Sequence, residues 1–279
     1  MVSDVDIKPC GSYFDLDEQG YIINPASKDK IQPHWKGAVN ETVAALLAHA
    51  GESVIDSIYV RGSVAKGESV DSVSDLDVLT LMRLDSIKTN TAWIPDFTIR
   101  MKKKFPFLTG IDIDFFPITE DQSGREQHVK LLQSACVYGD DRTKKVRPLK
   151  PGKELAIRSV CLFRIMEWTQ EWLTHPHNKE TVQRACTWIM KSFLRSGFEL
   201  TMERSKKYTR DLYLCYEGFS EYYPEKRKLM KRALYLAINP TGDQREIQEM
   251  MSRVGEWLLV EILGKIGKPN TEFIIDFKE

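Results

Sequence analysis

Apolar and polar positions follow two different periods along the chain. Strand-type residues run from 55 to 60 and end at Gly62, and a second apolar run covers 76–82. Residues 111–115 alternate strictly between apolar and acidic side chains. A period of two predicts strands in these three segments. Apolar residues at helical spacing predict helices before, between and after these strands, at about 34–49, 94–105 and 124–136.

The second half of the chain has the helical period alone. Apolar positions predict helices near 155–172, 182–194, 210–222, 225–238 and 245–263, separated by proline and glycine. A late strand is expected only in the tail, at 273–277. The basic stretch 142–153, with Pro148, Pro151 and Gly152, predicts a linker. We therefore expect an irregular arm over 1–33, a catalytic domain over 34–147 and a helical domain over 148–279.

Composition narrows the class of protein. The 279 residues are 42% hydrophobic and 29% charged, with 40 basic and 40 acidic residues. A net charge of zero gives no overall attraction to nucleic acid or membrane, although short basic clusters occur, such as 102–104 and 226–228. The five cysteines are scattered without a zinc spacing, and no apolar run approaches the length of a membrane span. We expect a reduced, cytoplasmic protein without a membrane partner.

Two carboxylates stand out on the second strand. Asp75 and Asp77 are two residues apart in an apolar run, which predicts that they share one face. Their mutual repulsion would be relieved by a cation, and ligands that are all oxygen suit Mg²⁺. The turn at Gly62 and Ser63 just upstream offers backbone N–H groups and a hydroxyl, which suit a phosphate chain.

A further acidic pair lies on the predicted strand 111–115. Asp112 and Asp114 share the face opposite Ile111, Ile113 and Phe115. On an isolated strand such a pair is typical of a solvated face.

The segment from Arg61 to Gly67, followed by Ser74-Asp75-Leu76-Asp77, resembles the DNA polymerase β-like nucleotidyltransferases, most closely the bacterial antibiotic and minimal types. This resemblance covers about a tenth of the chain. It implies an α+β fold, with a mixed sheet flanked by helices followed by an all-helical domain. It also implies a third carboxylate on the strand beside that of Asp75 and Asp77. Asp112 is the first choice for this carboxylate, and Asp114 is the alternate, a base or a supporting partner.

The resemblance implies a Mg²⁺-dependent transfer of a nucleoside monophosphate, with AMP from ATP favoured. Asp75, Asp77 and Asp112 would hold two Mg²⁺ ions, and Asp114 or a glutamate of the helical domain would act as base. The expected nucleotide contacts are Arg61, Gly62, Ser63, Lys66 and Ser74, with Lys191, Arg195 and Arg210 in the helical domain. Arg61 could equally form a strand-end salt bridge, and Lys66 could be a solvated helix residue. The three residues of the helical domain could be helix caps or members of interhelix ion pairs.

The acceptor is open at this stage. A small hydroxylated molecule such as an aminoglycoside is favoured, and a homodimer is an alternative to a monomer. The same chemistry could act on tRNA or on a protein, as in toxin-like nucleotidyltransferases. A nucleotide-binding module without turnover is the third hypothesis, disfavoured because the Gly-Ser turn and every candidate carboxylate are present.

Overall fold

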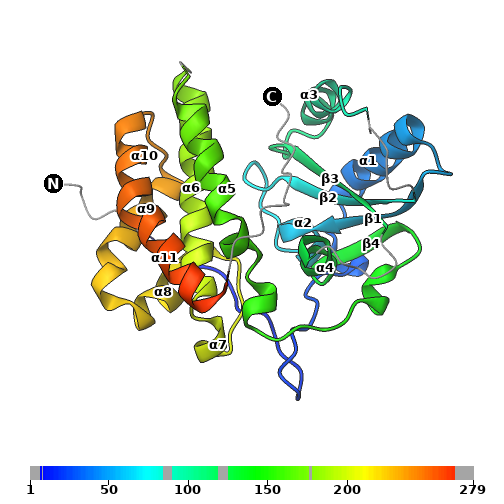
Figure 1. The fold of residues 1–279 in the computed structure, drawn as a ribbon. Helices are drawn as coiled ribbons and strands as arrows, with labels where there is room; N and C mark the ends of the chain where they lie inside the picture. The colour runs from blue at the N-terminus through cyan, green and yellow to red at the C-terminus, as the bar shows by residue number, and fades with distance from the viewer. Residues whose placement is uncertain (1–6, 8, 84–89, 119–124, 176–177, 268–279) are drawn as a thin grey trace. The chain divides into compact units, whose positions relative to one another are not determined.

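The computed structural model describes residues 7, 9–83, 90–118, 125–175 and 178–267 (Figure 1). The chain divides into two compact units. One, the sheet unit, comprises residues 23–148, and the other, the helical unit, comprises 1–22 together with 149–279. The expected arm is shared between them, because residues up to Ile22 belong to the helical unit and those from Ile23 to the sheet unit.

The sheet unit is built on a four-stranded mixed sheet in the order β3-β2-β1-β4. Its strands are β1 (Ile55–Arg61), β2 (Leu76–Met82), β3 (Ile111–Pro117) and β4 (Ser134–Gly139). β1 pairs antiparallel with both β2 and β4, whereas β2 and β3 are parallel. The parallel pair needs a crossover, which α3 (Ile94–Lys104) supplies. The fold class is therefore α+β, as predicted.

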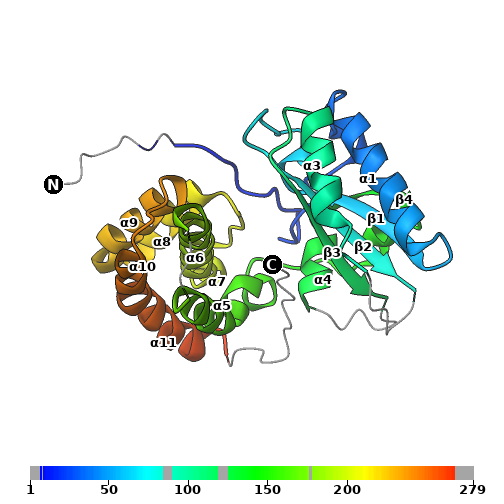
Figure 2. The ribbon, with the colours of Figure 1, turned by 90° about the horizontal axis from the view of Figure 1, so that it is seen from above.

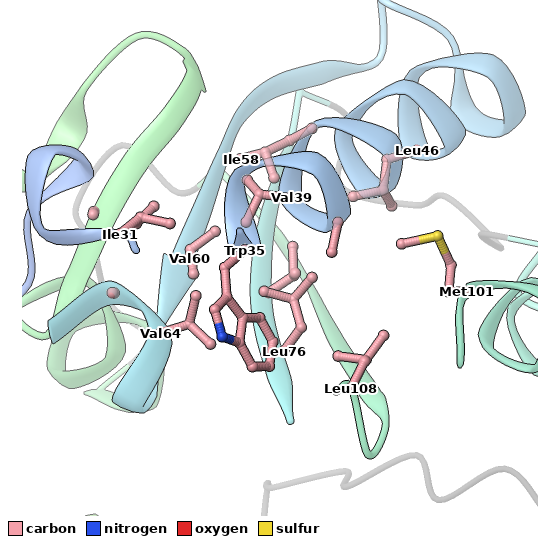
Figure 3. Close-up of a cluster of buried hydrophobic side chains, with 14 of the residues drawn as sticks. Ile31, Trp35, Val39, Leu46, Ile58, Val60, Val64, Leu76, Met101 and Leu108 are labelled. Atoms are coloured by element: carbon pink, nitrogen blue, oxygen red, sulfur yellow. The ribbon is translucent and has the colours of Figure 1, made fainter. Parts of the chain in front are cut away.

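One face of the sheet carries the hydrophobic core. α1 (Trp35–Ala50) and α3 lie on the same side of the sheet (Figure 2). Trp35, Val39 and Leu46 of α1 pack against Ile58, Val60 and Leu76 of the strands, with Met101 of α3 in the same cluster (Figure 3). Because strand side chains alternate between faces, Arg61, Asp77, Asp112 and Asp114 belong to the opposite face.

The sequence prediction is wrong for part of the segment 124–136, whose first residue lies outside the described ranges. The helix there, α4 (Arg125–Leu131), ends early, and residues from Ser134 form β4. The apolar residues Val129 and Leu131 fit a helix, but Ala135 and Cys136 pair with Val60 and Tyr59 of β1. This non-local pairing decides the strand, and local spacing does not reveal it.

The helical unit contains α5 (Ile157–Leu173), α6 (Lys179–Glu199), α7 (Met202–Ser205), α8 (Leu212–Tyr222), α9 (Arg227–Ile238), α10 (Gln244–Met250) and α11 (Glu256–Lys265). A π-helical turn at Met251–Gly255 joins α10 to α11, so the predicted helix 245–263 is one element with a local bulge. α6 packs against α5, α8 and α9, and the end-on view of Figure 2 shows α5 and α6 running alongside each other. The expected strand 273–277 lies outside the described residues.

The N-terminal segment is tied to the helical unit by backbone and ring contacts. Phe14 N donates to Tyr208 O at 2.8 Å, and the Phe14 ring meets the Tyr208 ring edge-on. Ile22 N donates to Leu149 O at 2.9 Å, where the chain returns to this unit. The two points at which the chain leaves and re-enters the helical unit are therefore neighbours.

Two findings concern membrane-spanning helices and disulfide bonds. Within the described residues, none of the helices combines the length and the apolar character that crossing a membrane requires. The five cysteines all lie in the described residues, and none of them forms a disulfide there.

Candidate functional site

The turn after β1 is shaped by two glycines. Gly62 begins the short helix α2 (Gly62–Lys66) with a φ of +71°, and Gly67 ends it with a φ of +76°. Both angles lie in the left-handed region, which glycine adopts without strain. A side chain at Gly62 would collide with a carboxylate oxygen of Asp77. The turn thus brings the Gly62 backbone against the Asp77 carboxylate.

Serine hydroxyls hold the loop between α2 and β2. Ser63 Oγ donates to Ser74 Oγ at 3.0 Å, and Ser74 Oγ accepts from Val70 N at 2.9 Å. Thr109 Oγ1 donates to Ser74 O at 2.8 Å. Asp75 follows immediately, exposed and just before β2 begins. Ser63 and Ser74, both predicted nucleotide contacts, are therefore adjacent.

Three of the four predicted carboxylates meet at one guanidinium. Arg61 Nη2 lies 3.0 Å from Asp114 Oδ2, 3.4 Å from Asp77 Oδ1 and 3.6 Å from Asp112 Oδ2. The register of the parallel pair explains the meeting, because Asp77 is opposite Asp112 and Leu79 is opposite Asp114. Arg61 itself pairs with Asp77 across β1 and β2.

Lys130 and Glu126 belong to this group, and the sequence analysis missed them. Lys130 Nζ lies 2.8 Å from Asp114 Oδ2 and 2.8 Å from Glu126 Oε1, and it stands 5.0 Å from the centre of the Phe116 ring. A single lysine on a short helix has no local signal of function. Its role becomes visible only when α4 is placed beside β3.

The electrostatics of the group differ from residue to residue. Burial opposes the charge on Arg61, but Asp77, Asp114 and Asp112 outweigh it and raise the pKa of the guanidinium. Burial first, and then repulsion from Asp114 and Asp77, raises the pKa of Asp112 to about 6. The Asp112 side chain is 63% exposed, so the neighbouring carboxylates contribute strongly to this rise in its pKa. Asp112 therefore has less positive charge close to it than Asp114 has.

The donors suit a hard divalent cation. The ion pairs set four carboxylates, those of Asp77, Asp112, Asp114 and Glu126, against the two cations Arg61 and Lys130. The resulting charge of about minus two matches one divalent ion, and oxygen ligands suit Mg²⁺. In the described parts of the chain, however, no cluster of three or more His, Cys, Asp or Glu side chains is arranged to hold a metal. Arg61 lies among the carboxylates instead.

Lys66 is placed differently from the carboxylate group. Its Nζ lies 3.3 Å from Glu68 Oε2 and its side chain is 15% exposed, so it is not the solvated helix residue that the sequence analysis left as the alternative. The cation is within the turn that Gly62 and Gly67 delimit.

The helical unit contains a crowded set of arginines. Burial, followed by repulsion from Arg210 and Arg158, lowers the pKa of Arg195 to about 9. Arg195 Nε donates to the backbone oxygen of Arg210 at 3.4 Å. Glu199, fully packed at the end of α6, accepts from the backbone N–H groups of Arg158 and Ser159. An anion beside Arg195 would relieve the repulsion that its neighbours create.

Lys191, the remaining predicted contact, lines an open groove of about 340 Å³ with Arg184, Trp188 and Pro240. It lies one helical turn before Arg195 on α6. Arg195 and Arg210 lie together, with Arg158 as a neighbour that the sequence analysis did not identify.

Comparison with known proteins shows a likeness to solved structures alone. No family model and no curated protein matches the chain. Among solved structures, the chain is similar to spectinomycin adenyltransferase AAD(9) from Enterococcus faecialis with ATP and spectinomycin. The identity is 15%, the match covers 80% of this chain and 98% of that chain, and the TM-score is 0.48. A likeness of this degree carries no argument about activity, which must come from the side chains of this chain.

Proposed function

We propose that the protein is a Mg²⁺-dependent nucleotidyltransferase that moves a nucleoside monophosphate, favoured to be AMP from ATP, onto a hydroxyl acceptor. The observation that supports this most is the meeting of Asp77, Asp112 and Asp114 at Arg61, beside the turn at Gly62. A carboxylate cluster next to a glycine-serine turn suits a metal-bound triphosphate.

The proposed reaction is one displacement at the α-phosphorus. The acceptor oxygen forms a bond to phosphorus, the bond from phosphorus to the bridging oxygen breaks, and pyrophosphate leaves with that electron pair. The hydroxyl proton passes to a carboxylate base, for which Asp114 and a glutamate of the helical unit are the proposed choices. Bound Mg²⁺ would neutralise charge on the phosphates and lower the pKa of the attacking hydroxyl.

The residues of this chain divide the remaining work. Asp75, Asp77 and a third carboxylate would hold the metal, for which we propose two ions when nucleotide is bound. Gly62, Ser63 and Ser74 would position the triphosphate, and Arg61 and Lys66 would neutralise it. On the helical unit we propose Arg195, Arg210 and Lys191 as nucleotide contacts, since an anionic ligand would relieve the repulsion that Arg210 and Arg158 exert on Arg195.

For the acceptor we propose a small hydroxylated molecule such as an aminoglycoside. The test incubates the protein with each labelled NTP and Mg²⁺, in parallel with a panel of aminoglycosides and lincosamides and with total tRNA. Label on a small molecule would support the proposal, and label on RNA or protein would move the acceptor to the toxin-like class. Nucleotide binding without labelling would favour a non-catalytic module.

The control for this assay is Asp77→Ala. We expect it to reduce turnover by a factor of about 10³ or more, with folding retained because one anion is removed from a group of like charges. Asp71→Ala, at an exposed residue of the neighbouring loop that pairs with His34, should keep full activity. Full activity of a folded Asp77→Ala protein would contradict the proposed site.

A further inference from the structure

Asp112 and Asp114 are two residues apart on β3, but they differ in how much positive charge lies close to each carboxylate. A single oxygen of Asp114, Oδ2, lies 3.0 Å from Arg61 and 2.8 Å from Lys130. Asp112 approaches Arg61 at 3.6 Å and is 63% exposed, whereas Asp114 is 25% exposed. Asp114 is thus neutralised by two cations, while Asp112 keeps the capacity to bind another positive charge.

The strand register separates the two residues in the same way. Asp112 is directly opposite Asp77, and Asp114 is opposite Leu79. Two residues along a strand correspond to about 6.6 Å. A cation held by Asp77 is therefore within reach of Asp112, and Asp114 lies further along the sheet.

Contacts with three groups hold the Lys130 side chain in place beside the Asp114 carboxylate. It is only 13% exposed, and it contacts Asp114, Glu126 and the face of Phe116. These two ion pairs and the ring contact hold the ammonium group of Lys130 in one position beside Asp114. Glu126, Lys130, Asp114 and Arg61 thus form a row of alternating charges, which we call the charge row.

Arg61 stands at the end of the charge row with unused hydrogen-bonding capacity. One nitrogen, Nη2, makes the three carboxylate contacts, and the buried Nε lacks a hydrogen-bond partner in the described structure. A guanidinium can bind carboxylate and phosphate at the same time through its separate N–H groups. Its shortest contact is to Asp114, so it is held at that side of the group.

The geometry points to Asp114 as a positioning residue: with Lys130 it holds the Arg61 guanidinium ready for a phosphate oxygen, while Asp112 joins Asp77 as a cation ligand. This inference rests on the proposed function and deepens it. It assigns a role to Lys130 and Glu126, removes Asp114 from the candidate bases and leaves the acceptor proton to another carboxylate.

The first test identifies the ligand directly. In Asp112→Cys and the matched Asp114→Cys protein, Cd²⁺ titration reports sulfur ligation through an ultraviolet charge-transfer band, since thiolates favour soft metals. The wild type, with its five native cysteines, supplies the background. We expect the added band in Asp112→Cys alone. An added band in Asp114→Cys would make Asp114 a ligand and overturn the inference.

The second test addresses Arg61 through Lys130. In Lys130→Met, we expect the KM for the nucleotide to rise about tenfold, with a smaller change in kcat, through weakening of a charge-assisted phosphate contact. Lys130→Arg should restore most of the affinity, and thermal unfolding separates this effect from misfolding. An unchanged KM in folded Lys130→Met would overturn the role of the charge row.

Failure of the proposed function would look different. A wild type that neither binds nor transfers any nucleotide would overturn that proposal, and the phosphate role of Arg61 with it. A band in Asp114→Cys, or an unchanged KM in Lys130→Met, would overturn the charge row while nucleotidyl transfer stands.

Discussion

At the scale of single residues, Gly62 links backbone conformation to the carboxylate group. Its φ of +71° is costly for any other residue, and the position of an added Cβ is taken by Asp77 Oδ2. The Asp77 carboxylate can therefore keep its position only while residue 62, at the end of the neighbouring strand, has no side chain.

We predict that Gly62→Ala loses at least tenfold in turnover and about 1–2 kcal/mol in the free energy of unfolding. The strain falls on the turn and displaces Asp77 from its present contacts. Turnover assays and urea denaturation measure the two effects. Gly110→Ala is the matched control, since an added Cβ there meets nothing within 4 Å. Equal behaviour of the two variants would contradict this reading of Gly62.

The residues of the site differ in how far sequence predicts them. Asp77 was singled out by the period of two in an apolar run, and Asp112 by the resemblance, which implies a third carboxylate on the strand beside it. The ion pairing of Asp114 was not predicted, because it depends on Lys130 of α4, which has no periodicity of its own. Arg158 was missed for the same reason, since only packing brings it near Arg195.

At the scale of elements, the far end of β1 is anchored by a buried ion pair. Arg142 donates to Asp56 at 2.6 Å from Nε and 3.0 Å from Nη2, and Tyr59 Oη donates to Asp140 O. Asp56 is buried, and Arg142 begins the short 3-10 turn Arg142–Lys145 after β4. The pair thus fixes the end of the sheet unit to its central strand.

We predict that Arg142→Met lowers the free energy of unfolding by about 3 kcal/mol, because it leaves the Asp56 carboxylate buried without its main partner. Urea denaturation at pH 7 measures the change. Lys144→Met, at an exposed lysine of the same turn, should cost less than about 0.5 kcal/mol. A loss no larger than that of the control would show that Asp56 needs no partner.

The same pair predicts a pH dependence. The hydrogen bond from Arg142 lowers the pKa of Asp56 below its ordinary value of 3.8, against the effect of burial. A lowered folded-state pKa stabilises the protein above the unfolded-state pKa, and this stability is lost as the pH falls through the folded-state value. The difference between wild type and Arg142→Met should therefore stay constant from pH 7 to 5 and shrink below about pH 4. A constant difference down to pH 2.5 would contradict the linkage.

The first turn of α5 depends on a side chain from another helix. Ser159 N donates to Glu199 Oε2 at 2.6 Å and Arg158 N donates to Oε1 at 3.1 Å, which satisfies two N–H groups that a helix start leaves without partners. We predict that Glu199→Ala costs about 2–3 kcal/mol, and that Glu199→Gln costs less because its oxygen still accepts. Hydrogen exchange at these two amides should accelerate in Glu199→Ala and stay slow in the exposed control Glu203→Ala.

Elements were predicted well where the local period is long and regular. α1, α3, α6 and the first three strands follow their apolar spacing, because each has a buried face that the spacing alone defines. β4 was not predicted, since its identity comes from pairing with β1 about 80 residues away, as for Tyr59 and Cys136.

At the scale of the whole molecule, the chain enters the helical unit twice. Phe14 is buried there, and Ser12 N donates to Asp211 Oδ2 from a position 199 residues away in sequence. The boundary between Pro148 and Leu149 lies within the predicted linker, but the assignment of residues 1–22 follows from tertiary contacts alone. The spacing of apolar residues along the sequence carries no information on such contacts.

We predict that Phe14→Ala destabilises the helical unit by about 3 kcal/mol through loss of a buried aromatic side chain. Hydrogen exchange should accelerate in α8, next to this segment in the structure, while the amides of β1 keep their protection. The exposed neighbour Asp15 provides the control as Asp15→Ala. Equal acceleration in β1 and α8 would mean that the two units unfold as one.

The contact between Ile22 and Leu149 has a consequence for how the protein is made. Residues 23–148 leave the ribosome and can complete their own core before any helix of the other unit exists. The N-terminal segment meanwhile waits, since its partners Tyr208 and Asp211 are synthesised nearly 200 positions later. The sheet unit is in this sense an insertion with adjoining ends, and residues 12–14 can pack against Tyr208 and Asp211 only after those two residues have been synthesised.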